Sequence, residues 1–192
     1  MQPAERDLIK RAKSGDMDAF EELVCRYDRQ VLSIAMNFTK DADQAKDIYQ
    51  EVFLKVFKSL DGFAFRSQFS TWLFRVATNV SLSYISSEKR RRQISIDEVT
   101  EDSEAQQRHL RGKLVSRPDS DRRAFSHEIA SRIQSALSHL SNQQRAVFVL
   151  RHYEGHRLRE IAAILECAEG TVKKHLFIAT ARMRENLKEL HA

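Results

Sequence analysis

The fold of the C-terminal part of the chain is decided by one stretch of sequence. It reads Arg159-Glu160-Ile161-Ala162-Ala163-Ile164-Leu165, then Glu166-Cys167-Ala168-Glu169-Gly170, then Thr171-Val172-Lys173-Lys174-His175-Leu176-Phe177. The first segment predicts a short helix and the second a tight turn. The third begins a longer helix that reaches about residue 190, with Thr171 as its N-cap. A short helix, a tight turn and a longer helix are typical of a helix-turn-helix, whose second helix enters a DNA groove.

A further helix is expected just before this motif. Ser141 followed three residues later by Gln144 forms a capping box, which predicts a helix over residues 143–153. In the longer helix of the motif, Val172, Leu176, Ala179 and Met183 recur at helical spacing and form the expected buried stripe. Thr171, Lys173, Lys174 and Phe177 lie largely off that stripe, near the end that would enter a groove.

The N-terminal half predicts a bundle of four helices. A short helix near residues 7–13 precedes a long one from about Asp18, a third capped by Asp41 with Gln44 as its capping-box partner, and a fourth after Ser70. Apolar residues recur every three or four positions in the three longer helices, so each has one face to bury. Strand signals are almost absent. The fold class is therefore all-α, and four such helices are enough to enclose a common core.

The two helical parts are separated by a polar segment of about 30 residues. Residues 93–126 contain few apolar side chains, and a structureless gap of that length inside one domain would be unusual. We expect an N-terminal domain over residues 1–92, a flexible linker over 93–126 and a C-terminal domain over 127–192. Their net charges are +3, −1 and +3. Two basic blocks at the ends would suit a polyanion bound at both.

Composition excludes several classes of protein. With 5 Gly, 2 Pro and 42% hydrophobic residues, the chain is neither collagen-like nor disordered throughout. Cys25 and Cys167 are too far apart for a zinc motif or a disulfide framework, which favours a reducing compartment. No apolar run approaches the roughly 18 residues of a membrane span, and the charged N-terminus lacks a signal-peptide core. We expect a cytoplasmic protein with no direct membrane insertion.

Enzymatic activity is not expected either. The sequence has no Gly-rich phosphate loop, nucleophile elbow or HExxH motif. His152 and His156 are four residues apart, but Gly155 lies between them and no third ligand is evident. We therefore predict no metal site, no cofactor and no small-molecule substrate.

Three motifs in series resemble one family. They are Asp47-Ile48-Tyr49-Gln50-Glu51-Val52-Phe53, Phe69-Ser70-Thr71-Trp72-Leu73-Phe74-Arg75-Val76-Ala77-Thr78-Asn79, and Glu160-Ile161-Ala162 followed by Gly170-Thr171-Val172-Lys173. In order, spacing and total length, the chain resembles bacterial sigma factors of the extracytoplasmic-function (ECF) group. The resemblance covers nearly all of residues 5–92, similar to sigma region 2, and 127–190, similar to region 4.

The resemblance implies a role for each matching position. In such proteins the helix that here carries Asp47, Gln50 and Glu51 docks on the β′ clamp helices of core RNA polymerase. The next loop and helix read and open the −10 promoter element, which here implies Phe65, Arg66, Phe69, Trp72, Arg75 and Asn79. The last helix reads the −35 element, with Thr171, Lys173, Lys174 and Phe177 at the matching positions. Arg151, before the helix-turn-helix, matches a basic position that contacts the same DNA segment.

Physical chemistry is compatible with these roles and also with simpler ones. Aromatic rings such as Phe65, Phe69 and Trp72 stack on bases of an opened strand, yet the same rings are equally typical of a protein core. The basic run that includes Lys89 and Arg90 would neutralise phosphates near the −10 element, or form a solvated helix end. Asp47, Gln50 and Glu51 would by themselves be an ordinary solvent-facing surface.

The interpretation is therefore an RNA polymerase sigma factor that contacts core polymerase and two promoter elements at once. The resemblance also implies restraint by an anti-sigma factor, which in many relatives is membrane-anchored. Two alternatives remain open at this point. One is a stand-alone helix-turn-helix transcriptional regulator that binds DNA as a dimer, and the other is a protein-binding adaptor.

Overall fold

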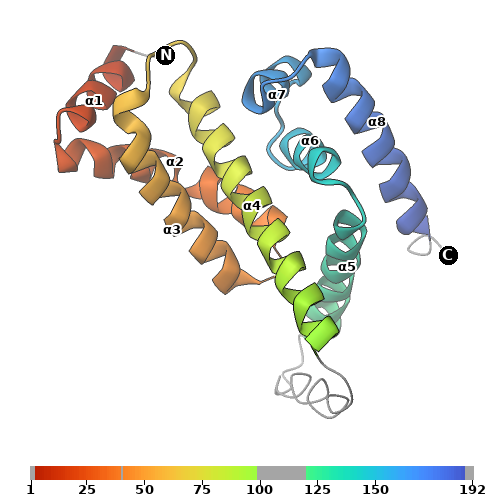
Figure 1. Ribbon diagram of the computed structural model, residues 1–192. Coiled ribbons are helices and arrows are strands. Elements are labelled where there is room, and N and C mark those ends of the chain that lie inside the picture. The colour runs from red at the N-terminus through yellow and green to blue at the C-terminus, as the bar shows by residue number, and fades with distance from the viewer. Residues whose placement is uncertain (1–2, 40, 99–119, 189–192) are drawn as a thin grey trace.

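The computed structural model describes residues 3–39, 41–98 and 120–188, and all regular structure in these ranges is helical. The elements are α1 (Pro3–Lys13), α2 (Met17–Phe38), α3 (Ala42–Ser59), the 3₁₀ helix η1 (Leu60–Gly62), α4 (Phe69–Glu98), α5 (Ser120–Ser138), α6 (Asn142–His152), α7 (Leu158–Leu165) and α8 (Glu169–Asn186). We call α1–α4 the N-terminal module and α5–α8 the C-terminal module. Figure 1 shows α1 and α3 on one side of α4 and α6–α8 on the other, with α2 passing behind α4. The predicted all-α class is confirmed.

The N-terminal module is a bundle because each long helix buries one apolar stripe. In α2 the buried residues are Ala19, Leu23, Val31, Ile34, Ala35 and Phe38, and in α3 they are Ala45, Ile48, Val52, Phe53 and Val56. Both sets follow the predicted three- and four-residue spacing. The Asp16 side chain accepts a hydrogen bond from the Ala19 amide and so caps the start of α2.

The start of α3 was only partly predicted. Asp41 is the N-cap, and its carboxylate accepts from the Asp43 amide at 2.8 Å. The expected capping box is wrong, because the Gln44 Oε1 atom accepts from the Thr39 hydroxyl at 2.6 Å. Thr39 is buried, so its hydroxyl needs a partner, and Gln44 provides one.

Helix α4 begins earlier and ends later than its sequence pattern suggests. It starts at Phe69, so Ser70 lies inside the helix and is not its N-cap. It continues to Glu98, past the expected domain end at residue 92, and α5 begins at Ser120 within the expected linker. The rest of that predicted linker, residues 99–119, lies outside the described residues.

The C-terminal module contains the predicted helix-turn-helix as α7 and α8. The capping box that begins α6 is confirmed: the Ser141 hydroxyl accepts from the Gln144 amide, and the Gln144 side chain accepts from the Ser141 amide. Thr171 as a helix cap is wrong, since α8 begins two residues earlier with Ala168 at the N-cap position. Glu166, directly after α7, adopts a left-handed conformation with φ of +52° and ends that helix as predicted.

The two modules share one hydrophobic core. Buried residues from α6, α7 and α8, including Val147, Leu150, Ile161 and Val172, belong to the same cluster as the core of the N-terminal module. Helix α7 packs against α4, and α6 packs against α2 and α4. We call this contact the module interface. Among the described helices, none has a stretch long and apolar enough to cross a membrane.

Candidate functional site

The loop between η1 and α4 is built around four aromatic rings. The Phe63 ring lies 5.0 Å from Phe65, 5.6 Å from Phe69 and 5.3 Å from Trp72, measured between centroids. Phe63 and Phe69 are buried, at 3% and 1% exposure, whereas Phe65 and Trp72 are partly exposed. Phe65 and Trp72 are therefore the two rings of this cluster that keep solvent-accessible surface. The prediction that Phe69 stacks on a base is corrected, because its ring is buried in the core, where it packs against Phe63 and Trp72.

The remaining predicted −10 residues differ in how free their side chains are. Arg66 and Asn79 are exposed, and so are Lys89 and Arg90 towards the C-terminal end of α4. These residues extend from the aromatic loop along α4. Arg75, in contrast, is already bound to another part of the protein.

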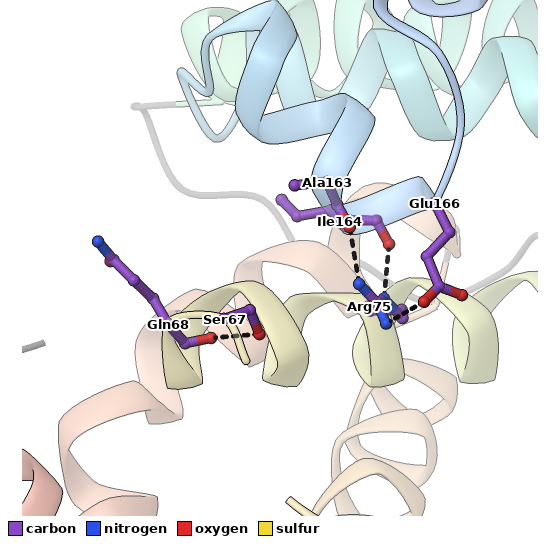
Figure 2. Close-up of polar contacts among 6 residues, drawn as sticks. All are labelled: Ser67, Gln68, Arg75, Ala163, Ile164 and Glu166. Atoms are coloured by element: carbon purple, nitrogen blue, oxygen red, sulfur yellow. Dashed lines mark hydrogen bonds and ion pairs between the residues drawn. The ribbon is translucent and has the colours of Figure 1, made fainter. Parts of the chain in front are cut away.

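Arg75 joins α4 to the end of α7. Its Nε donates to the Ile164 carbonyl at 3.1 Å and its Nη2 to the Ala163 carbonyl at 2.8 Å, while Nη1 forms an ion pair with Glu166 (Figure 2). Carbonyls at a helix C-terminus have no partner inside the helix, so a guanidinium is well suited to satisfy them. In this arrangement the Arg75 guanidinium belongs to the module interface.

A second arginine in the interface was missed by the sequence analysis. Arg145 on α6 is only 7% exposed, and its Nη2 donates to the Phe38 carbonyl at 3.0 Å and the Asn37 carbonyl at 3.4 Å, at the end of α2. Burial lowers the pKa of Arg145 to about 10. An arginine within the apolar run of a helix could have signalled a buried polar contact, although its partners are about a hundred residues away in sequence.

Further polar contacts connect the modules beside Arg145. The Ser33 hydroxyl donates to Glu154 Oε1 at 2.8 Å, and the Asn142 amide donates to the Ser86 hydroxyl at 3.1 Å. The module interface is therefore apolar at its centre and hydrogen-bonded around it.

The three predicted polymerase-docking residues share one exposed face of α3. Asp47, Gln50 and Glu51 are all exposed, and their spacing of three and four residues places them side by side on the helix. Leu54 continues the same face one turn further and is 53% exposed. The buried stripe of α3 lies on the opposite side, so this face is available to a partner.

The predicted −35 residues are all exposed. Phe177 is 77% exposed and, with Lys173, lines a shallow groove of about 430 Å³ between the start of α7 and α8. Thr171 and Lys174 are exposed in the first two turns of α8, and Arg151 on α6 donates to the His156 carbonyl at 3.0 Å. Lys173 also pairs with Glu169 at 3.1 Å, a surface contact that solvent weakens. The outer face of α8 thus presents cations and an aromatic ring.

Metal binding finds no support in the described part of the chain. Within it, no three His, Cys, Asp or Glu side chains gather closely enough to hold an ion. His156 instead lies 5.3 Å from the Phe74 ring across the module interface, and His152 lies 4.5 Å from Phe148.

Comparisons with known proteins match both the N-terminal and the C-terminal module. The family model for sigma-70 region 2 matches residues 23–91, and that for sigma-70 region 4 matches residues 130–183. The chain is 31% identical to the RNA polymerase sigma-H factor of Pseudomonas aeruginosa over 98% of its own length and 96% of that protein. It is also 31% identical to the ECF RNA polymerase sigma-E factor of Escherichia coli, over 95% and 94% of the two chains.

Solved structures show the same fold. CnrH, in complex with the cytosolic domain of CnrY, matches with a TM-score of 0.68 and 26% identity, over 97% of this chain and 99% of that one. The sigma factor RpoE of Bartonella quintana, in complex with the anti-sigma factor NepR, matches with a TM-score of 0.61 and 27% identity, over 88% and 96%. With regions 2 and 4 both matched and relatives aligned over almost its whole length, this chain belongs to the ECF sigma factors of the sigma-70 family.

Proposed function

We propose that the chain is a dissociable initiation subunit of bacterial RNA polymerase whose three exposed surfaces have separate tasks. The face of α3 with Asp47, Gln50 and Glu51 binds the β′ clamp helices of core polymerase. The aromatic loop and α4 hold the opened −10 element, and the outer face of α8 binds the −35 element in duplex DNA. The observation that carries this proposal is that all three surfaces are exposed on one chain whose relatives match both modules.

The chemistry of each DNA surface suits its target. The partly exposed Phe65 and Trp72 rings can stack on unpaired bases, each stack being worth about 1–3 kcal/mol. Lys173 and Lys174 can neutralise phosphates beside a major groove, and Phe177 can contact a thymine methyl group. Because the two modest contacts are linked in one chain, the second forms at high effective concentration.

Full promoter binding requires a change at the module interface. While the Arg75 guanidinium holds the Ala163 and Ile164 carbonyls, it cannot also contact DNA. We infer that the modules separate when polymerase and promoter are bound, and that Arg75 then joins the −10 surface.

The chain acts in the cytoplasm as a specificity subunit and leaves nucleotide polymerisation to the core enzyme. We also propose that an anti-sigma factor restrains it, since the matched RpoE structure contains the anti-sigma factor NepR. A stand-alone helix-turn-helix regulator is a weaker reading, because the relatives match the N-terminal module as well as the C-terminal one.

The docking assignment is tested by titrating core polymerase with the full chain. Asp47→Ala combined with Gln50→Ala should weaken core binding at least about tenfold, because it removes two polar contacts of roughly 1 kcal/mol each. Asp18→Ala combined with Gln30→Ala is the matched control, since it removes the same residue types from exposed positions on α2. Equal affinity of the two double variants would contradict the docking assignment.

A further inference from the structure

Phe65 has an unusual backbone for an aromatic residue. Its φ of +56° lies in the left-handed region, which L side chains rarely adopt and glycine favours. Such conformations persist only where the surroundings hold them, and they cluster at ligand-binding sites. The contacts of the Phe65 side chain therefore indicate which ligand the strained loop could bind.

Two cations of α1 hold the Phe65 ring. The Arg6 guanidinium carbon lies 5.2 Å and the Lys13 Nζ 5.5 Å from the ring centroid. Lys13 also donates to the Phe63 carbonyl at 2.9 Å, which ties α1 to the same loop. Arg6 and Lys13 are seven residues apart, so two turns of helix place them on one face of α1.

These cations have no competing acidic partner in the described part of the chain. The neighbouring Glu5 accepts a hydrogen bond from Tyr27, and Arg11 pairs with Asp16. Arg6 is exposed and Lys13 is partly exposed. Two cations that share an aromatic ring, with no carboxylate between them, form a surface suited to a polyanion with stackable bases.

We propose that α1 is part of the −10 surface, with Arg6 and Lys13 binding phosphates of the opened DNA strand while a base stacks on Phe65. This inference rests on the proposed function, and it adds α1 to the elements that form the −10 surface. Helix α1 lies outside residues 23–91, the range that the region 2 model matches. In the free chain the two cations cover the ring; in the complex the base takes the ring and the cations take the adjacent phosphates.

The position of α1 supports this assignment independently of Arg75. Helix α1 packs on α2 and η1, at the end of the N-terminal module far from α6–α8 (Figure 1). Closing or opening the module interface therefore leaves Arg6, Lys13 and Phe65 accessible. They can make the first contact with an opening strand before Arg75 is released.

The test uses holoenzyme assembled from core polymerase and the full chain. Wild-type holoenzyme first selects a promoter from a randomised DNA pool, and that promoter is made as a fork whose non-template strand is single-stranded across the −10 element. The dissociation constant is measured across a series of KCl concentrations.

Arg6→Gln should lower the slope of log affinity against log salt by about 0.7, the value for one phosphate contact on a single strand. Phe65→Leu, which keeps an apolar side chain at the strained position, should weaken binding by about 5- to 150-fold with little change in slope.

Arg29→Gln is the matched control, because it removes the same charge from an exposed position on α2. The role of α1 would be overturned if Arg6→Gln had the same salt slope as wild type. It would also be overturned if Arg29→Gln lowered the salt slope by as much as Arg6→Gln does. If wild-type holoenzyme selects no promoter, the proposed function itself fails. Core binding and thermal melting are measured for each variant, so that a loss of folding is not mistaken for a loss of DNA contact.

Discussion

Two residues with unfavourable backbone conformations lie in regions to which this sigma factor's proposed DNA binding is assigned, the aromatic loop and the helix-turn-helix. Phe65 and Glu166 are the non-glycine residues with positive φ in the described ranges. For an L residue this conformation costs on the order of 1–2 kcal/mol. One lies in the aromatic loop of region 2 and the other in the turn of the helix-turn-helix, where it also meets Arg75. In both places the strained backbone positions a side chain that makes long-range contacts.

Tyr27 gives the fold a dependence on alkaline pH. Burial, strengthened by the hydrogen bond to Glu5, raises the pKa of Tyr27 above its usual value. A raised folded-state pKa favours the protonated form, so this stabilisation is complete below about pH 10 and is lost as the pH rises beyond it. The free energy of unfolding in urea should therefore be steady up to about pH 10 and fall as the pH rises above it.

In Tyr27→Phe that fall should be smaller, because the variant has no hydroxyl to ionise at this site. The variant should also be less stable at pH 8 by about 1 kcal/mol, the usual loss for one hydrogen bond. Parallel pH profiles for the two proteins would show that Tyr27 does not carry the effect.

At the scale of elements, the sequence predicts those helix ends that depend on local contacts. The Ser141–Gln144 box and the Asp41 cap join residues that are three apart or closer, so their signals can be read along the chain. Gln44 was misassigned because the buried Thr39 hydroxyl engages it. Thr171 was misassigned because the actual N-cap, Ala168, makes no side-chain cap hydrogen bond and so leaves no signal in the sequence. The candidate site residues come from the family resemblance and stay predictions, whereas the Arg75 contact joins residues 89 apart and has no local signal.

The cap of α6 should have a measurable effect on stability. Ser141→Ala removes the hydroxyl that accepts from the Gln144 amide, and such losses cost about 0.5–2 kcal/mol. Ser135→Ala, at an exposed position near the end of α5, is a suitable comparison. Chemical unfolding should show the larger loss for Ser141→Ala, and equal midpoints would argue against a stabilising cap.

At the scale of the whole molecule, the module interface combines a shared core with two arginines. Arg75 binds the end of α7, and Arg145 binds the end of α2. Each guanidinium meets helix C-terminal carbonyls, which concentrate partial negative charge. The interface therefore combines a few discrete polar contacts with a continuous apolar centre.

Removing Arg75 should loosen that interface. Arg75→Ala deletes two charged hydrogen bonds and one ion pair, a loss of about 2 kcal/mol or roughly 30-fold in the balance between packed and separated modules. Small-angle X-ray scattering of the full chain should show a larger radius of gyration than for wild type. Arg66→Ala, at an exposed loop position, should leave the radius unchanged. The same radius in all three proteins would show that Arg75 does not hold the modules together.

The central claim is that one chain docks on core polymerase and directs it to two promoter elements. Run-off transcription with purified core polymerase tests it most directly, on the selected promoter and on versions with the −10 or the −35 element scrambled. The account predicts one discrete transcript that requires the chain and both elements, and that is reduced by Asp47→Ala combined with Gln50→Ala. Transcription that is indifferent to the added chain, together with binding of the chain as a dimer to palindromic DNA in the absence of polymerase, would contradict it.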